Sequence, residues 1–128
     1  MTTSMKTPLG KVRGLGSAKS GTEHFWRQRL TGVALVPLTI IFVLALIGLA
    51  RADAATALAR LRSPWLGLPL LLFVGAGAYH MRLGMQVIIE DYVTDETLKL
   101  AAVMANAFFC VLIGVLCAYA LLKLNFGV

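Results

Sequence analysis

The sequence places polar and ionisable side chains within and at the end of an apolar segment. His80 lies deep in the run that begins at Ser63, and Asp91 and Tyr92 follow near the end of that run. Polar groups are costly inside a membrane, so each of these residues is a candidate for function. Imidazole is a common axial ligand of haem iron. A phenol and a carboxylate suit a quinone, whose reduction takes two electrons and two protons.

Two explanations of His80 are compatible with the sequence: an axial haem ligand, or a histidine hydrogen-bonded to a neighbouring helix. Gly77 and Gly84 lie on the same helical stripe as His80. Such a stripe either leaves a flat trough for a porphyrin face or lets membrane helices pack closely. His24, the other histidine, precedes the first apolar run at a different depth. If His80 binds haem, the second axial ligand is therefore expected from another chain.

The polar residues at the ends of the apolar runs also allow two explanations. By helical rise, Asp91 lies about 16 Å and Tyr92 about 18 Å from His80, with Asp91 on nearly the same face. They either meet a quinone headgroup or form an ordinary helix end at the membrane interface. Arg29, at the start of the first run, either anchors its helix at the interface or binds a haem propionate or a quinone oxygen.

The composition favours an integral membrane protein. Of 128 residues, 59% are apolar and 14% are charged, whereas soluble domains are about 45–50% apolar and about 25% charged. A domain this small cannot hide so much apolar surface from water, which argues against a soluble enzyme. The net charge of +6 comes largely from basic residues before the first apolar run. Such residues have a membrane explanation, so no nucleic-acid partner is expected.

Three apolar runs predict an all-α protein with three transmembrane helices in up-down-up order. The predicted spans are residues 30–50, 63–89 and 101–122. Each is long enough to cross a hydrocarbon core of about 30 Å. None shows the alternation of apolar and polar residues that is typical of a β-barrel strand. The resulting transmembrane domain, 30–122, is expected to join a bundle with other chains. A basic arm (1–29), loosely held over its first 20 residues, precedes it, and a short tail (123–128) follows.

The distribution of Lys and Arg predicts the orientation. The arm and the second loop share one side and carry seven Lys or Arg residues, against four on the other side. The positive-inside rule then puts the N-terminus in the cytoplasm, or on an equivalent matrix side, and the C-terminus outside. The expected location is a bacterial inner membrane, with the C-terminus in the periplasm. A cleaved signal peptide is not expected. Cys110 and Cys117 lie on one face of the third span and are expected to pack rather than to bind metal.

The ordered set of motifs resembles a known family. HFWRQRLTG leads into the first span, and AYHMRLGMQVIIEDYV lies in the second, with the histidine and tyrosine twelve residues apart. This pattern, roughly H-x3-G-x6-D-Y, is similar to that of the smaller hydrophobic membrane-anchor subunit of succinate dehydrogenase (complex II). The version here looks like the alphaproteobacterial and mitochondrial type. The resemblance covers the chain from about Gly21 onward.

The resemblance implies roles for single residues. His80 corresponds to an axial ligand of haem b, whose other axial histidine comes from the larger cytochrome b anchor subunit. Asp91 and Tyr92 match the pair at the ubiquinone site, where the tyrosine hydroxyl holds a quinone carbonyl.

The remaining candidates match the family less closely. Arg29 resembles an arginine near the haem propionates, although the local match is loose. Arg82 has no clear counterpart and is a weaker candidate for a propionate or quinone contact. Gly77 and Gly84 would pack against the haem.

The resemblance also implies a non-catalytic subunit of a respiratory complex of the tricarboxylic acid cycle. In such a complex the flavoprotein subunit oxidises succinate, and the iron–sulfur subunit passes electrons to ubiquinone. This chain would anchor both subunits in the bilayer, co-ligate haem b and contribute only to the quinone site, with no catalytic residue of its own. Two alternatives are a haem-free structural or assembly protein and the anchor of another quinone-linked complex, such as fumarate reductase.

Overall fold

The structure, a computed structural model, describes residues 7–14 and 21–127, and over these residues it contains helices and no strand. The helices are α1 (Pro8–Val12), α2 (Glu23–Ala50), α3 (Ala54–Arg62), α4 (Pro64–Tyr92) and α5 (Glu96–Phe126). Of these, α2, α4 and α5 are long and apolar enough to cross a membrane. The prediction of an all-α membrane protein with three spanning helices is confirmed. The loosely held arm was expected largely on residues 1–6 and 15–20, which lie outside the described residues.

The long helices extend beyond the apolar runs that predict them. Helix α2 begins at Glu23, so the basic and aromatic segment before the first run is helical, and α5 continues to Phe126. Only residues 93–95 separate α4 from α5. The carboxylate of Asp95 accepts a hydrogen bond from the Leu98 backbone N–H and caps the start of α5. Hydrogen bonds from the Thr97 side chain and then from the Leu98 N–H lower the pKa of Asp95.

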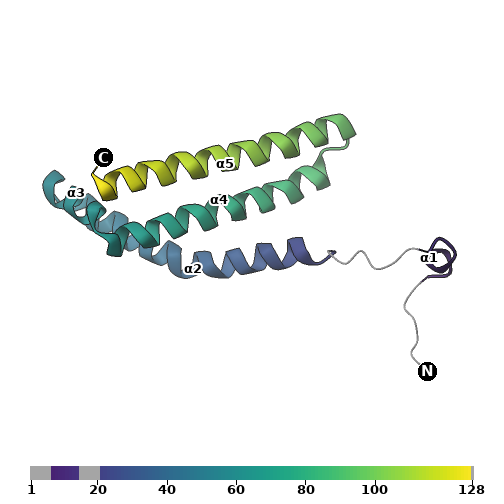
Figure 1. The fold of residues 1–128 in the computed structure, drawn as a ribbon, viewed down its shortest axis with the longest axis horizontal. Helices are drawn as coiled ribbons and strands as arrows, with labels where there is room; N and C mark the ends of the chain where they lie inside the picture. The colour runs from purple at the N-terminus through teal and green to yellow at the C-terminus, as the bar shows by residue number, and fades with distance from the viewer. Residues whose placement is uncertain (1–6, 15–20, 128) are drawn as a thin grey trace, which may run out of the picture.

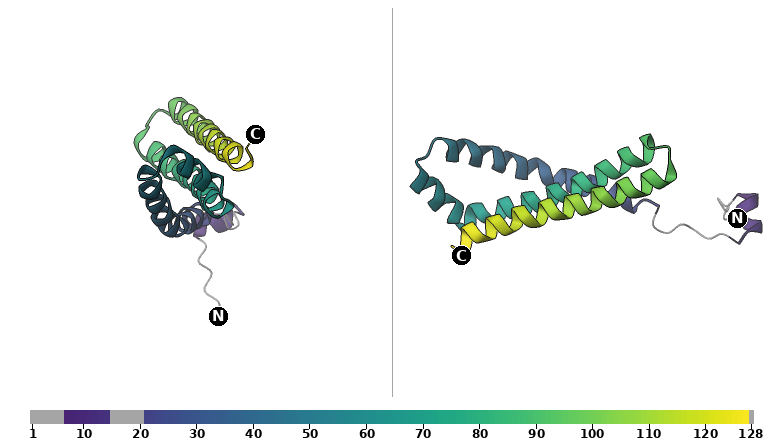
Figure 2. Two further views of the ribbon diagram at one scale, coloured as in Figure 1. Left: turned by 90° about the vertical axis from the view of Figure 1, so that its left-hand side faces the viewer. Right: turned by 90° about the horizontal axis from the view of Figure 1, so that it is seen from above.

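The three long helices form a row with α4 in the middle. Figures 1 and 2 show α4 between α2 and α5, and among the described residues α2 and α5 do not contact each other. The short helix α3 packs across the end of the row where α2 ends and α4 begins. Helix α1 contacts none of the other described helices. Helix α4 is therefore the element through which the whole arrangement is held together.

Close approaches and a few polar contacts join these helices. Phe42 of α2 stacks on Phe73 of α4 with ring centroids 4.5 Å apart. Between α4 and α5, a Cβ atom added at Gly114 would lie only 3.2 Å from the Ala78 Cβ atom, so glycine lets these backbones come close. Cys110, also on this interface, is buried at 2% exposure, consistent with the packing role expected for it.

One polar contact fixes α3 against the end of α5. Asn125 of α5 donates from Nδ2 to the Leu61 carbonyl of α3 at 3.0 Å. The Asn125 side chain lies directly over Gly67 of α4, where a Cβ atom would overlap it. Gly67 is buried, so this position has no room for a larger side chain.

Gly67→Ala is therefore expected to push the Asn125 amide away from the Leu61 carbonyl and to destabilise the protein by about 1–3 kcal/mol, as overpacking commonly does. The measurement is the midpoint of thermal unfolding in detergent. Gly75→Ala is the matched control on the same helix, because nothing lies within 4 Å of its added Cβ atom. Equal midpoints for the two variants would show that the Gly67–Asn125 contact does not matter.

Candidate functional site

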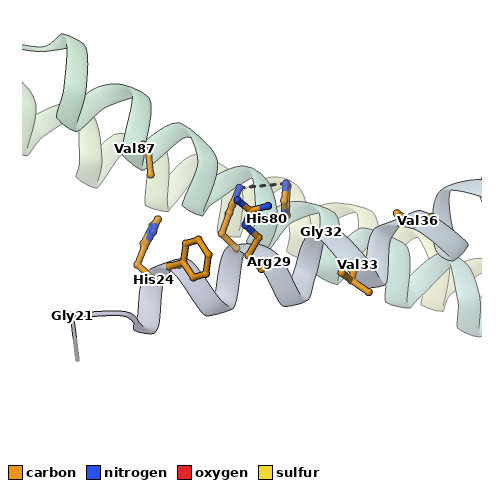
Figure 3. Close-up of a pocket in the computed structure, with 10 residues that line it drawn as sticks. Gly21, His24, Arg29, Gly32, Val33, Val36, His80 and Val87 are labelled. Atoms are coloured by element: carbon orange, nitrogen blue, oxygen red, sulfur yellow. Dashed lines mark hydrogen bonds between the residues drawn. The ribbon is translucent and has the colours of Figure 1, made fainter. Parts of the chain in front are cut away.

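The candidate site is an open groove between α2 and the second half of α4 (Figure 3). Its cavity of about 670 Å³ lies in the range of small-molecule and cofactor sites, about 300–1,000 Å³. The residues that line it are Gly21, His24, Phe25, Gln28, Arg29, Gly32, Val33, Val36, His80 and Val87. His80 is thus brought together with a polar stripe of α2.

The imidazole of His80 contacts two polar side chains of α2. Its Nδ1 atom lies 2.9 Å from Oγ1 of Thr31, and its Nε2 atom lies 3.3 Å from Nε2 of Gln28. Thr31 Oγ1 is also 2.8 Å from the Arg27 carbonyl, to which it donates. A hydroxyl has one hydrogen, so while Thr31 donates to this carbonyl its oxygen is an acceptor for His80 Nδ1–H. This pattern leaves the Nε2 lone pair to accept from the Gln28 amide N–H.

Glycines allow α2 and α4 to approach each other around this imidazole. A Cβ atom at Gly32 would lie 3.4 Å from His80 Cε1, and one at Gly84 would lie 3.2 Å from the Gln28 amide nitrogen. A Cβ atom at Gly77 would reach the Leu35 side chain at 4.0 Å. In this chain Gly77 and Gly84 therefore face α2, with Gly84 beside the groove.

Two buried polar atoms near the groove have no hydrogen-bond partner among the described residues. They are Nε2 of His24 and Oε1 of Gln28, and both side chains line the cavity. Buried polar atoms are normally paired, so these two are exceptions beside the groove. Arg29 also lines the groove, and its guanidinium lies 5.1 Å from the centre of the Phe25 ring. The groove is thus polar at its α2 side.

Asp91 and Tyr92 lie at the C-terminal end of α4, away from the His80 contacts. Both are exposed, and Tyr92, the last residue of the helix, is 81% exposed. Neither side chain has a hydrogen bond or ion pair with another described residue. Because α4 is continuous from His80 to Asp91, the two lie on nearly one line of the helix, with Val87 between them. Tyr92 is turned about a third of the way round the helix from that line.

Arg82 lies on the other side of α4 from His80. It borders a separate recess of about 280 Å³ between α4 and α5, together with Tyr79 and Cys110. The Arg82 carbonyl accepts a hydrogen bond from Asn106 Nδ2 of α5 at 2.9 Å. The structure therefore brings Arg29 to the groove of His80 and separates Arg82 from it.

Comparison with known proteins identifies the family. The family model for the succinate dehydrogenase/fumarate reductase transmembrane subunit matches residues 3–114. The chain belongs to this family. It is 33% identical to a succinate dehydrogenase hydrophobic membrane anchor subunit of Rickettsia bellii, over 88% of this chain and 90% of the relative. It is 32% identical to that of Paracoccus denitrificans, over 94% and 93%. No solved structure matches the chain.

The matched region of this succinate dehydrogenase/fumarate reductase transmembrane subunit contains the whole groove. It includes α2, α3, α4 and the first part of α5, and hence His80, Asp91 and Tyr92. Sequence reasoning missed Thr31, Gln28 and Gly32 as partners of the imidazole. A signal for them was present, because positions 24, 28 and 31 share one helical face once the helix is extended back to Glu23.

Proposed function

We propose that this chain is the hydrophobic membrane-anchor subunit of a succinate dehydrogenase in a bacterial inner membrane. Together with a larger cytochrome b anchor subunit it would hold the iron–sulfur and flavoprotein subunits at the membrane and share a haem b. It would also form part of the site where ubiquinone is reduced. The observation that carries the proposal is the imidazole of His80, presented from α4 into a groove of a chain that belongs to this family.

The residues of the groove fit a haem bound through one axial histidine of this chain. With His80 Nδ1–H donating to Thr31, the Nε2 lone pair faces the Gln28 amide 3.3 Å away, and this amide would have to turn aside for Nε2 to ligate iron. His24 and Gln28 have buried polar atoms without partners, and Arg29 adds a positive charge beside them. When bound, haem b supplies a one-electron carrier. His80 would hold it, and Arg29 would offset the charge of a propionate.

The end of α4 suits the quinone site. The start of α2 and the connection at residues 93–95 lie at the same end of the helix row (Figure 1), which the positive-inside rule assigns to the cytoplasm. The Tyr92 hydroxyl would donate a hydrogen bond to a quinone carbonyl, and the Asp91 carboxylate would pass protons from water. The two electrons come from the iron–sulfur subunit, and the two protons complete the quinol.

His80→Ala is expected to abolish or alter the haem b spectrum, because it removes one axial ligand. The measurement is a dithionite-reduced minus oxidised spectrum of the detergent-solubilised complex, with its co-purifying subunits identified by mass. Cys117→Ala, at an exposed position of α5 that does not line the groove, should retain the b-type bands. An unaltered spectrum in an assembled complex that carries His80→Ala would rule out His80 as an axial ligand. Purification without flavoprotein and iron–sulfur partners would instead favour a haem-free structural protein.

Tyr92→Phe is expected to lower quinone reduction about tenfold, the effect of one lost hydrogen bond of about 1.4 kcal/mol. Succinate oxidation should stay near the wild-type rate when it is measured with an artificial dye that takes electrons before they reach the quinone site. Tyr119→Phe, which removes another exposed tyrosine hydroxyl on α5, is the control. If both activities fall together in Tyr92→Phe, the complex is misassembled; unchanged quinone reduction would show that the hydroxyl has no role.

Asp91→Asn is expected to slow quinone turnover by about 10²-fold. A group that transfers protons in a reaction typically contributes about 10²- to 10⁴-fold to the rate, and this is the lower end of that range. The rate is measured across the pH range against the same dye assay. Glu90→Gln alters the neighbouring acid, which accepts a hydrogen bond from Gln86, and should leave turnover near the wild-type rate. Wild-type turnover of Asp91→Asn at every pH would remove the proton-transfer role.

A further inference from the structure

We propose that Thr31 is a positioning residue for His80, which selects the ring nitrogen that ligates iron and tunes the strength of that ligand. This inference rests on the haem role proposed above for His80. It concerns the side of the imidazole that faces away from the iron. The atoms involved are Thr31 Oγ1 and His80 Nδ1, 2.9 Å apart between α2 and α4.

The direction of this hydrogen bond follows from the other contacts of Thr31. Its Oγ1 lies 2.8 Å from the Arg27 carbonyl and 3.1 Å from the Gln28 carbonyl, both on the preceding turn of α2. The single hydroxyl hydrogen is used there, which leaves the oxygen lone pairs to accept from His80 Nδ1–H. A hydroxyl that already donates is polarised, and this makes it a better acceptor.

Position 31 is suited to this role by its surroundings. Thr31 and His80 are both part-buried, so water competes little for the hydrogen bond. Gly32, the next residue, leaves space for the ring, since a Cβ atom there would already touch His80 Cε1 at 3.4 Å. Thr31 is β-branched, so its hydroxyl has few alternative directions on the helix. The ring is therefore held in one orientation before any ligand binds.

The consequence for a bound iron is a more basic ligand. A ligating histidine that donates its other N–H to an acceptor has a fixed tautomer and a raised basicity at the ligating nitrogen. A stronger donor favours the more highly charged, oxidised iron. Removal of the Thr31 acceptor should therefore shift the midpoint potential of haem b to more positive values and weaken haem retention.

The test compares Thr31→Val, which removes the hydroxyl at nearly constant shape, with Thr31→Ser, which keeps it. Thr39→Val makes the same change at an exposed position of α2. In the assembled complex, Thr31→Val should lose haem affinity about 10- to 100-fold. If the preference for oxidised over reduced haem falls tenfold, the midpoint potential of haem b shifts by about 59 mV to more positive values. Thr31→Ser and Thr39→Val should stay close to wild type. A wild-type potential and wild-type haem retention in Thr31→Val would overturn the proposal.

A second measurement does not depend on haem. In the haem-free full-length chain with ¹⁵N-labelled histidine, in detergent micelles, NMR should find Nδ1 of His80 protonated and Nε2 unprotonated. In Thr31→Val the two tautomers should mix. Protonation of Nε2 in the wild-type chain would overturn the role of Thr31, even if the complex contains haem. A wild-type complex without haem, combined with the expected tautomer, would instead overturn the haem proposal and retain the hydrogen-bond assignment.

Discussion

A polar side chain inside a membrane helix must find a hydrogen-bond partner, because lipid offers none. His80 satisfies this constraint with two side chains of α2, Thr31 and Gln28. The contact requires α2 and α4 to lie close together, and the glycines at positions 32 and 84 provide the space. The packing of the first two long helices and the geometry of the groove therefore depend on the same few residues.

The helices of this chain leave much of their surface uncovered. Helix α4 has a neighbour on each side, whereas α2 and α5 do not meet, and α2 contains no buried residue. Among the described residues, Leu70, Leu83 and Cys110 form the whole buried apolar core. In a membrane the remaining apolar surface is covered by lipid or by further helices. The buried polar atoms of His24 and Gln28 that have no partner among the described residues belong to side chains that line the groove.

The sequence predicted the elements of the fold well, because hydropathy and length decide which segments can cross a bilayer. It also identified His80, since an imidazole in an apolar run is conspicuous. It did not predict the partners of the imidazole. Thr31 and Gln28 are ordinary polar residues, and their role depends on how α2 is rotated against α4. The extension of α2 back to Glu23 was also missed, because charged and aromatic residues at a membrane interface do not show whether the chain is helical there. The contact of Asn125 with Leu61 spans 64 positions, which no local pattern reveals.

The periodicity of α4 separates two kinds of surface on one helix. Two residues after His80 the helix has turned by about 200°, so Arg82 faces the recess on the α5 side, whereas Asp91, eleven residues on, returns to the line of His80. One side of α4 therefore packs against α5, and the other carries the candidate ligand and, further along, the candidate proton carrier. The groove cannot be built by α4 and α5 alone. It requires α2, and specifically the two turns of α2 that precede the first apolar run, because these turns place His24 and Gln28 opposite Val87 and Gly84. The basic segment at the start of α2 thus also forms one wall of the candidate site.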